Sequence, residues 1–151
     1  MGSGSEQVIS IEEKLRQEAR SSALEGRVTF SGRVDNVAAY LQASDVFVFP
    51  TLNESLGMSA VEAQACGLPA VASRTGGVPD IIEDGVTGIL VPPGDGRAFS
   101  EALRHLIQDT ELRARYAVAA RKRMEALFAT EVMVARYVEL FRSLAAARRA
   151  P

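Results

Sequence analysis

Two carboxylates flank a glycine-containing turn in residues 50–67, PTLNESLGMSAVEAQACG. Glu54 stands just before the turn, and Glu62 follows Gly57 by five residues. On a helix that interval corresponds to about 7 to 8 Å along the axis. A carboxylate accepts two hydrogen bonds side by side, so each of these residues can hold a pair of neighbouring hydroxyl groups. The spacing therefore suits a ligand that carries phosphate between two hydroxyl-rich ends.

An anion site is expected at the turn between these carboxylates. Residues 57–66 favour a helix closed by Gly67, and the first amides of a helix point outward along a dipole that attracts phosphate. Gly57 permits a close approach to the backbone. A second interpretation stays open, in which Glu54 only complements the helix dipole and Glu62 only lies on a solvated helix face. The amides concerned are those of Ser55, Leu56, Gly57 and Met58.

Alternating strands and helices position this stretch. Because continuous apolar strands alternate with helices, we predict an α/β fold: a parallel sheet with helices on both faces. Ligands bind at the carboxyl ends of the strands in such sheets, which is where residues 50–67 begin. The predicted strands are residues 28–31, 46–49, 70–72 and 89–91. The predicted helices are residues 11–24, 36–43, 57–66, 80–83, 110–127 and 130–144, with another that Asp95 caps.

The N-terminal residues carry local start and stop signals. Ser10 and Glu13 form a capping-box pattern, so a helix should begin at residue 11 and stop before Gly26. Asp35 can cap the helix of residues 36–43. We predict a flexible leader at residues 1–5, a partial Rossmann-like domain at residues 6–129 and a C-terminal helix and tail at residues 130–151.

Composition excludes several classes of function. With 17 basic against 19 acidic residues and a pI near 5.5 in 151 residues, nucleic acid is not expected as a partner. A single cysteine, Cys66, and a single histidine, His105, give no disulfide framework and no zinc cluster. We expect Cys66 to be a buried small residue and His105 to lie partly exposed on a helix.

Location follows from the apolar runs and the basic clusters. No apolar run approaches the ~20 residues that span a bilayer, and no signal-peptide core is present, so the cytoplasm is the predicted compartment. Basic clusters at residues 121–123 and 148–149 leave a weak contact with an anionic membrane surface open. Solvated helix faces are the commoner reason for such clusters.

The ordered blocks of residues 27–128 resemble the group 1 retaining glycosyltransferases of the GT-B fold. Glu54 and Glu62 match the family's Glu-x7-Glu motif, inside ASDVFVFPTLNESLGMSAVEAQACGLPAVASRTGGVPDIIEDGVTGILVPPGD. The resemblance implies a nucleotide-sugar donor. Glu54 would be the catalytic residue near the transferred sugar, and Glu62 would hold the ribose. The amides of Leu56 to Met58 would bind the diphosphate, and backbone groups near Arg33 and Val34 would face the nucleobase.

The same resemblance implies sugar transfer with retention of anomeric configuration and with no cofactor or metal ion. The family's first two strands, their diphosphate-gripping Arg and Lys, and the acceptor domain have no counterpart in these residues. We therefore expect a donor-binding part that is inactive alone. Arg74 does not match those cations, and Gly76 and Gly77 are assigned to a turn.

The strand order that the resemblance implies is 3-2-1-4-5-6. Strands 46–49, 70–72 and 89–91 should then remain neighbours. Residues 28–31 belong at the far edge, so we expect them to close against residues 46–49, or another chain to fill the gap by self-association.

Two other classes of function stay open. One is a non-catalytic module that binds a nucleotide or a partner protein. The other is a dinucleotide oxidoreductase, which the absence of G-x-G-x-x-G after a strand makes unfavourable.

Overall fold

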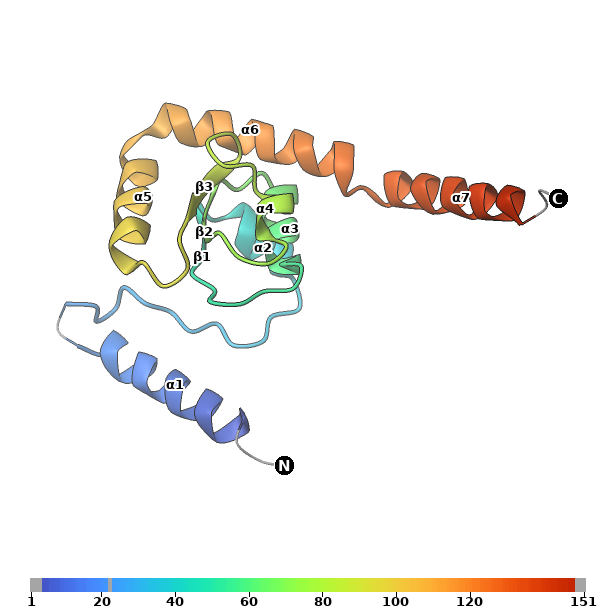
Figure 1. Ribbon diagram of the computed structural model, residues 1–151. Helices are drawn as coiled ribbons and strands as arrows, with labels where there is room; N and C mark the ends of the chain where they lie inside the picture. The colour runs from blue at the N-terminus through green and yellow to red at the C-terminus, as the bar shows by residue number, and fades with distance from the viewer. Residues whose placement is uncertain (1–3, 22, 149–151) are drawn as a thin grey trace. The chain divides into compact units, whose positions relative to one another are not determined.

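The computed structural model describes residues 4–21 and 23–148 (Figure 1). Contacts divide the chain into two units, Met1–Asp35 and Asn36–Pro151. The first unit contains α1 (Gly4–Ala19), followed by turns in which Leu24 and Glu25 donate to the carbonyl of Ser21. Of the predicted leader, residues 1–3 lie outside the described residues, and Gly4 and Ser5 belong to α1.

Three predictions for the N-terminal part are wrong. The helix spans Gly4–Ala19 rather than residues 11–24, so the capping-box residue Ser10 lies inside it, because Ser-x-x-Glu also occurs within helices. Residues 28–31 form no strand, and a strand there is what the expected closure against residues 46–49 requires. Alternating apolar residues give no strand without a partner edge, and Val28 and Phe30 are exposed. Asn36, not Asp35, caps the next helix, since its side chain accepts from the amide of Ala39 at 3.1 Å.

The second unit contains a parallel sheet with the strand order β1-β2-β3. These strands are β1 (Phe47–Phe49), β2 (Ala70–Ser73) and β3 (Gly88–Val91). Phe47 lies opposite Ala70, and Ala70 lies opposite Gly88. The predicted neighbours are therefore confirmed. Within the described residues β1 pairs only with β2, so its other edge is open, and whether another chain fills it stays a prediction.

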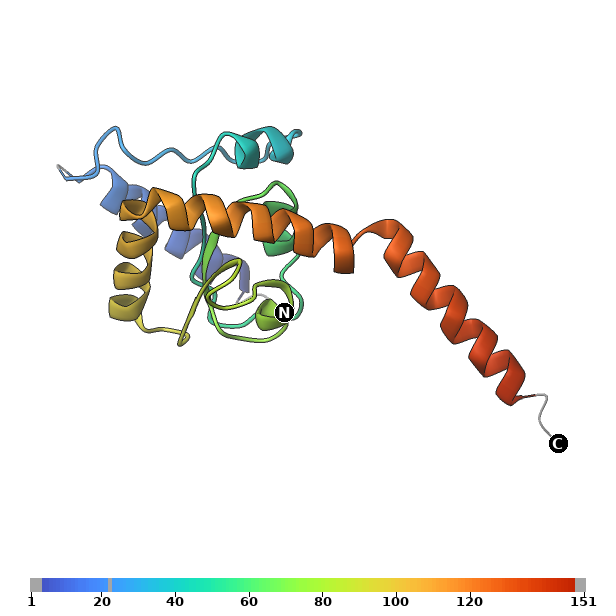
Figure 2. The same cartoon turned by 90° about the horizontal axis from the view of Figure 1, so that it is seen from above.

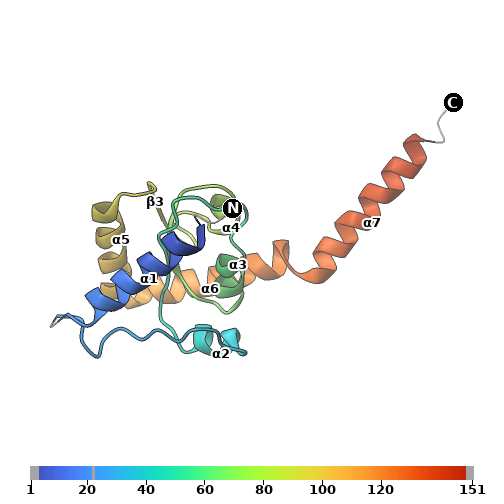
Figure 3. The ribbon, with the colours of Figure 1, turned by 90° about the horizontal axis from the view of Figure 1, so that it is seen from below.

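Helices cover both faces of this sheet, as predicted. Figures 1 and 3 show α5 on one side of the strands and α3 with α4 on the other. The helices of this unit are α2 (Val37–Gln42), α3 (Met58–Ala65), α4 (Val78–Ile81), α5 (Gly96–Gln108), α6 (Thr110–Leu127) and α7 (Thr130–Ala147). The predicted 80–83 helix begins two residues earlier because Pro79 is tolerated in a first helical turn.

Alternation along β2 explains the two buried clusters. Ala70 and Ala72 face α3, α4 and the second half of α6, where Ala60, Val78, Ile81 and Met124 are buried. Val71 faces the opposite side, against Leu106 of α5 and Leu112 and Tyr116 of α6. Figure 2 shows α6 passing from α5 toward α3, so this helix contributes to both clusters.

Candidate functional site

The loop after β1 ends at a glycine in a left-handed conformation. Gly57 has a φ of 91° and is the N-cap of α3, without a side-chain cap hydrogen bond. A Cβ atom at Gly57 would lie 3.4 Å from Ile81 Cδ1 and 3.7 Å from Val78 Cγ2. Both side chains are fully buried. These distances are ordinary van der Waals contacts, so the positive φ is the reason why a glycine starts the helix here.

Glu54 turns back onto the backbone of its own loop. Its Oε1 accepts hydrogen bonds from the amides of Ser55, at 2.9 Å, and Leu56, at 3.3 Å. These two amides are therefore engaged, which corrects the expectation that the amides of residues 55–58 are all exposed for an anion. Among the described hydrogen bonds, the amides of Gly57 and Met58 have no acceptor. Met58 is exposed, whereas Gly57 is buried.

A second loop packs against the backbone of the first. The amide of Gly77 donates to the carbonyl of Ser55 at 3.1 Å. A Cβ at Gly77 would lie 2.7 Å from that oxygen, and one at Gly76 would lie 1.5 Å from the carbonyl oxygen of Glu54. These glycines were assigned to a turn from the sequence, and their contact with the candidate site was missed. The signal was present, because two consecutive glycines follow β2, the strand next to β1.

Glu62 lies on α3 with its side chain exposed. It borders a hollow of about 360 Å³ between α2 and α3. The lining residues are Val37, Ala38, Leu41, Glu62, Ala65 and Cys66. Glu62 is the only carboxylate among them. Cys66 is half-buried rather than buried.

Arg33 and Val34 belong to the first unit of the chain, whereas the loop of residues 54–58 and α3 belong to the second. Arg33 is exposed and Val34 is half-buried. Their assignment to the nucleobase stays a prediction.

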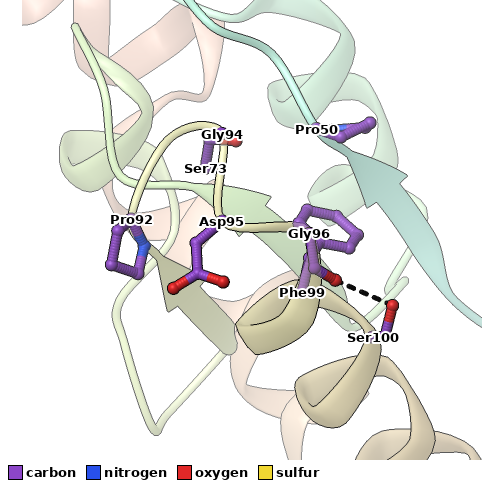
Figure 4. A pocket seen from close by; sticks show the side chains of 8 residues that line it. All are labelled: Pro50, Ser73, Pro92, Gly94, Asp95, Gly96, Phe99 and Ser100. Atoms are coloured by element: carbon purple, nitrogen blue, oxygen red, sulfur yellow. Dashed lines mark hydrogen bonds between the residues drawn. The ribbon is translucent and has the colours of Figure 1, made fainter.

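A separate hollow of about 280 Å³ lies at the carboxyl ends of the three strands (Figure 4). Its polar groups serve the start of α5: Asp95 accepts from the amide of Ala98 at 2.9 Å, and the hydroxyl of Ser100 donates to the carbonyl of Gly96 at 2.8 Å. None of the predicted site residues lines it. The lining residues are Pro50, Ser73, Pro92, Gly94, Asp95, Gly96, Phe99 and Ser100.

Other polar residues take structural roles. Arg74, just after β2, forms an ion pair with Asp84, whose other oxygen accepts from the amide of Leu90 at 2.9 Å. His105 is exposed on α5, as expected.

In the part of the chain that the structure describes, no three His, Cys, Asp or Glu residues gather as a metal site would require. No described helix combines the length and the apolar character needed to cross a membrane.

Comparisons with known proteins match the chain to one family. A family model described as "Glycosyl transferases group 1" matches residues 9–123. The N-acetyl-alpha-D-glucosaminyl L-malate synthase of Bacillus anthracis is 34% identical over 127 residues, which are 84% of this chain and 33% of that protein.

Solved structures agree with this match. Sucrose-phosphate synthase from Thermosynechococcus elongatus superposes with a TM-score of 0.81 at 34% identity, over 91% of this chain and 35% of that one. Anabaena HepE in complex with UDP superposes with a TM-score of 0.82 at 28% identity, over 87% of this chain and 36% of that one. The chain therefore spans about one third of the length of these relatives.

Proposed function

This chain belongs to the glycosyl transferases of group 1, and on that premise we propose that it forms the donor-binding part of an enzyme that transfers a sugar from a nucleotide sugar to an acceptor. The observation that carries the proposal is the loop of residues 54–58. It follows β1 at the carboxyl edge of a parallel sheet and ends at the left-handed Gly57, which starts α3. Ligands of open α/β sheets bind at this edge.

The free amides of Gly57 and Met58 suit the diphosphate of such a donor. Backbone amides at a helix N-terminus favour negative charge, and this charge grows on the diphosphate as the sugar departs. Glu54 lies beside these amides and is half-buried, so in this proposal its carboxylate leaves the amides of Ser55 and Leu56 when the diphosphate arrives, and it then faces the transferred sugar. The protein contributes positioning and charge stabilisation.

Glu62 is proposed to hold the ribose hydroxyls. Its exposed carboxylate borders the hollow between α2 and α3, which leaves room for a nucleoside beside an apolar wall. The solved complex of HepE with UDP supports a nucleotide as the ligand of this fold.

The proposal also includes retention of configuration, transfer without a metal ion and a cytoplasmic location. Product stereochemistry, turnover in EDTA and localisation of a tagged protein would test them.

Calorimetric titration of the chain with UDP, ADP and GDP tests the nucleotide site directly. We expect one nucleotide to bind, with Glu62→Ala lowering its affinity about tenfold, which equals about 1.4 kcal/mol. The matched control is Glu139→Ala, because Glu139 is an exposed carboxylate on α7. No binding of any nucleotide, or equal losses in both variants, would refute the assignment. Binding without turnover of a nucleotide sugar by the full-length protein would instead favour a non-catalytic nucleotide-binding module.

Kinetics of the full-length enzyme separate the two carboxylates. A ribose-holding group stabilises ground state and transition state alike, so Glu62→Ala should mainly raise KM. A group beside the reacting carbon acts in the transition state, so Glu54→Ala should mainly lower kcat, by about 10² to 10³. The reverse pattern would show that the two roles are exchanged.

A further inference from the structure

The glycine pair after β2 fixes the backbone that carries the candidate site. We propose that Gly77, together with Gly76, is a positioning residue that aims the amides of Ser55 and Leu56 at the donor. The proposal rests on the donor-binding role proposed above. It adds residues that act through the loop and touch no ligand themselves.

Position 77 requires glycine because of its close contacts with the first loop, and not because of its backbone conformation. Its φ of −80° is ordinary for any residue. A Cβ there would nevertheless lie 2.7 Å from the Ser55 carbonyl oxygen, closer than side chains approach, and in tight contact with Leu56 Cα at 3.0 Å. The Gly77 amide meanwhile donates to that same oxygen. Contact and hydrogen bond together fix the peptide that follows Ser55, and this peptide carries the amide of Leu56.

Gly76 adds a second restraint. Its φ is +52°, and a Cβ there would coincide with the carbonyl oxygen of Glu54 at 1.5 Å. The peptides on both sides of Ser55 therefore pack directly on this glycine pair. Because Glu54 Oε1 accepts from the amides of Ser55 and Leu56, the same two peptides also set the direction of its carboxylate before a donor binds.

The support behind the glycine pair is itself fixed. Gly77 is the N-cap of α4, whose Val78 and Ile81 are fully buried under the loop. The guanidinium of Arg123 donates to the carbonyls of Asp80 and Ile81 at 2.9 and 3.0 Å. The short helix is thus held by its buried side chains and by its last carbonyls, and it presents Gly77 to Ser55 as a rigid support.

Substitution by alanine tests the contact, with controls of matched backbone geometry. Gly77→Ala is paired with Gly96→Ala, because both glycines stand at a helix start without positive φ and the site around Gly96 is open. Gly76→Ala is paired with Gly85→Ala, because both have positive φ, at +52° and +75°, and only Gly76 meets the loop. The readouts are the affinity for the nucleotide that binds best among UDP, ADP and GDP, the amide NMR signals of Ser55 and Leu56, and the urea midpoint.

We expect Gly77→Ala to weaken nucleotide binding about tenfold or more and to shift the signals of Ser55 and Leu56, since small misplacements in a binding site are costly. Gly96→Ala and Gly85→Ala should leave both readouts within about twofold of the original. A purely structural role predicts a lower urea midpoint with unchanged affinity and unchanged amide signals in the folded variant. That result overturns the inference.

Two further outcomes are decided by the unsubstituted chain. If Gly77→Ala does not fold, hydrogen exchange decides: the Gly77 amide should be protected, and its signal should move with those of Ser55 and Leu56 when nucleotide binds. Rapid exchange, or a Gly77 signal that ignores nucleotide, overturns the inference. If no nucleotide binds to the unsubstituted chain, the proposed function fails. If nucleotide binds and the variants match their controls, only the positioning role fails.

Discussion

Helices α6 and α7 each have 18 residues and follow one another in the chain, yet they are used in opposite ways. The more apolar of the two, α7, has no buried residue along its described length, and it exposes Met133, Tyr137 and Phe141. The more polar helix, α6, buries Leu112, Tyr116, Ala120 and Met124. Apolar content alone therefore does not determine which helix packs.

Spacing explains the difference on α6. Its four buried residues recur every fourth position, which places them in one stripe along the helix. Leu112 and Tyr116 belong to the cluster under α5, and Met124 belongs to the cluster under α3 and α4. A single stripe thus connects the cores on the two faces of the sheet.

Arginines on α6 serve the ends of three other helices. Arg113 donates to the carbonyls of Leu106 and Ile107 near the end of α5, and Arg121 donates to Ala65 at the end of α3. Arg123 donates to residues of α4, as described above. The last carbonyls of a helix lack partners within it, so these contacts satisfy them. Two members of the basic cluster at residues 121–123 therefore make hydrogen bonds within the protein, and contact of this cluster with a membrane surface stays a prediction.

The largest expected difference between the two helices is at their methionines. Met124 is 3% exposed in the core, and Met133 on α7 is 50% exposed. We predict that Met124→Ala lowers the free energy of unfolding by about 2 to 5 kcal/mol, because it leaves a cavity. Met133→Ala should change it by less than about 0.5 kcal/mol. Urea denaturation of both variants measures this, and equal losses would show that α7 is packed after all.

A smaller difference is expected at the arginines. Arg123→Ala removes the donors to two carbonyls and the ion pair with Glu83, so we predict a loss of about 1 to 3 kcal/mol. The control is Arg142→Ala on α7, because the hydrogen bonds recorded for the described residues include none from Arg142. Arg123→Lys should restore only part of the loss, since one ammonium cannot replace the planar fork. If urea denaturation showed that Arg123→Lys restores the full stability, the positive charge alone would explain the contribution of Arg123.

The third test uses alkaline pH and the buried Tyr116. Burial, followed by the negative charge of Asp84, raises the pKa of Tyr116 above its usual 10.0. Above about pH 10 the unfolded chain ionises this tyrosine more readily than the folded one, so stability present below that pH is lost as pH rises. Tyr116→Phe should lose less stability than the original chain between about pH 8 and pH 11. Tyr137→Phe on α7, where the side chain is exposed, is the control, and urea midpoints at both pH values give the answer.

Local patterns were sufficient to predict much of the fold. The bounds of α6 at residues 110–127 were predicted correctly, and the Asp95 cap and the three neighbouring strands are confirmed. The wrong predictions concern features that depend on a neighbouring part of the structure. Residues 28–31 have the composition of a strand, but a strand requires a neighbouring edge. The bounds of α7 were also predicted to within a few residues, yet nothing in its sequence indicated that no residue of it would be buried.

The candidate site shows the same limit. Its place after β1 and the role of Gly57 follow from local sequence. The contact of Gly77 with Ser55 joins two loops that are distant in the chain, so the glycine pair indicates it only together with the pairing of β1 and β2. The return of Glu54 onto the amides of Ser55 and Leu56 is local, but it depends on a side-chain rotamer that the residue types leave undetermined.

The smallest expected effect tests whether the cost of a substitution depends on the exposure of the side chain or on which helix carries it. Val118 lies on the outer face of α6 and is 72% exposed, and Val138 on α7 is 40% exposed. If burial alone governs the cost, Val118→Gln and Val138→Gln should both change the free energy of unfolding by less than about 0.5 kcal/mol, despite the contrast between their helices. Glutamine also favours a helix slightly more than valine, so a small gain is expected in both. A loss above about 1 kcal/mol at Val138 alone in the purified protein would mean that another copy of the chain covers α7 in solution. Light scattering of the original chain and of Val138→Gln would then check this, because self-association raises the measured mass and the substitution should lower it.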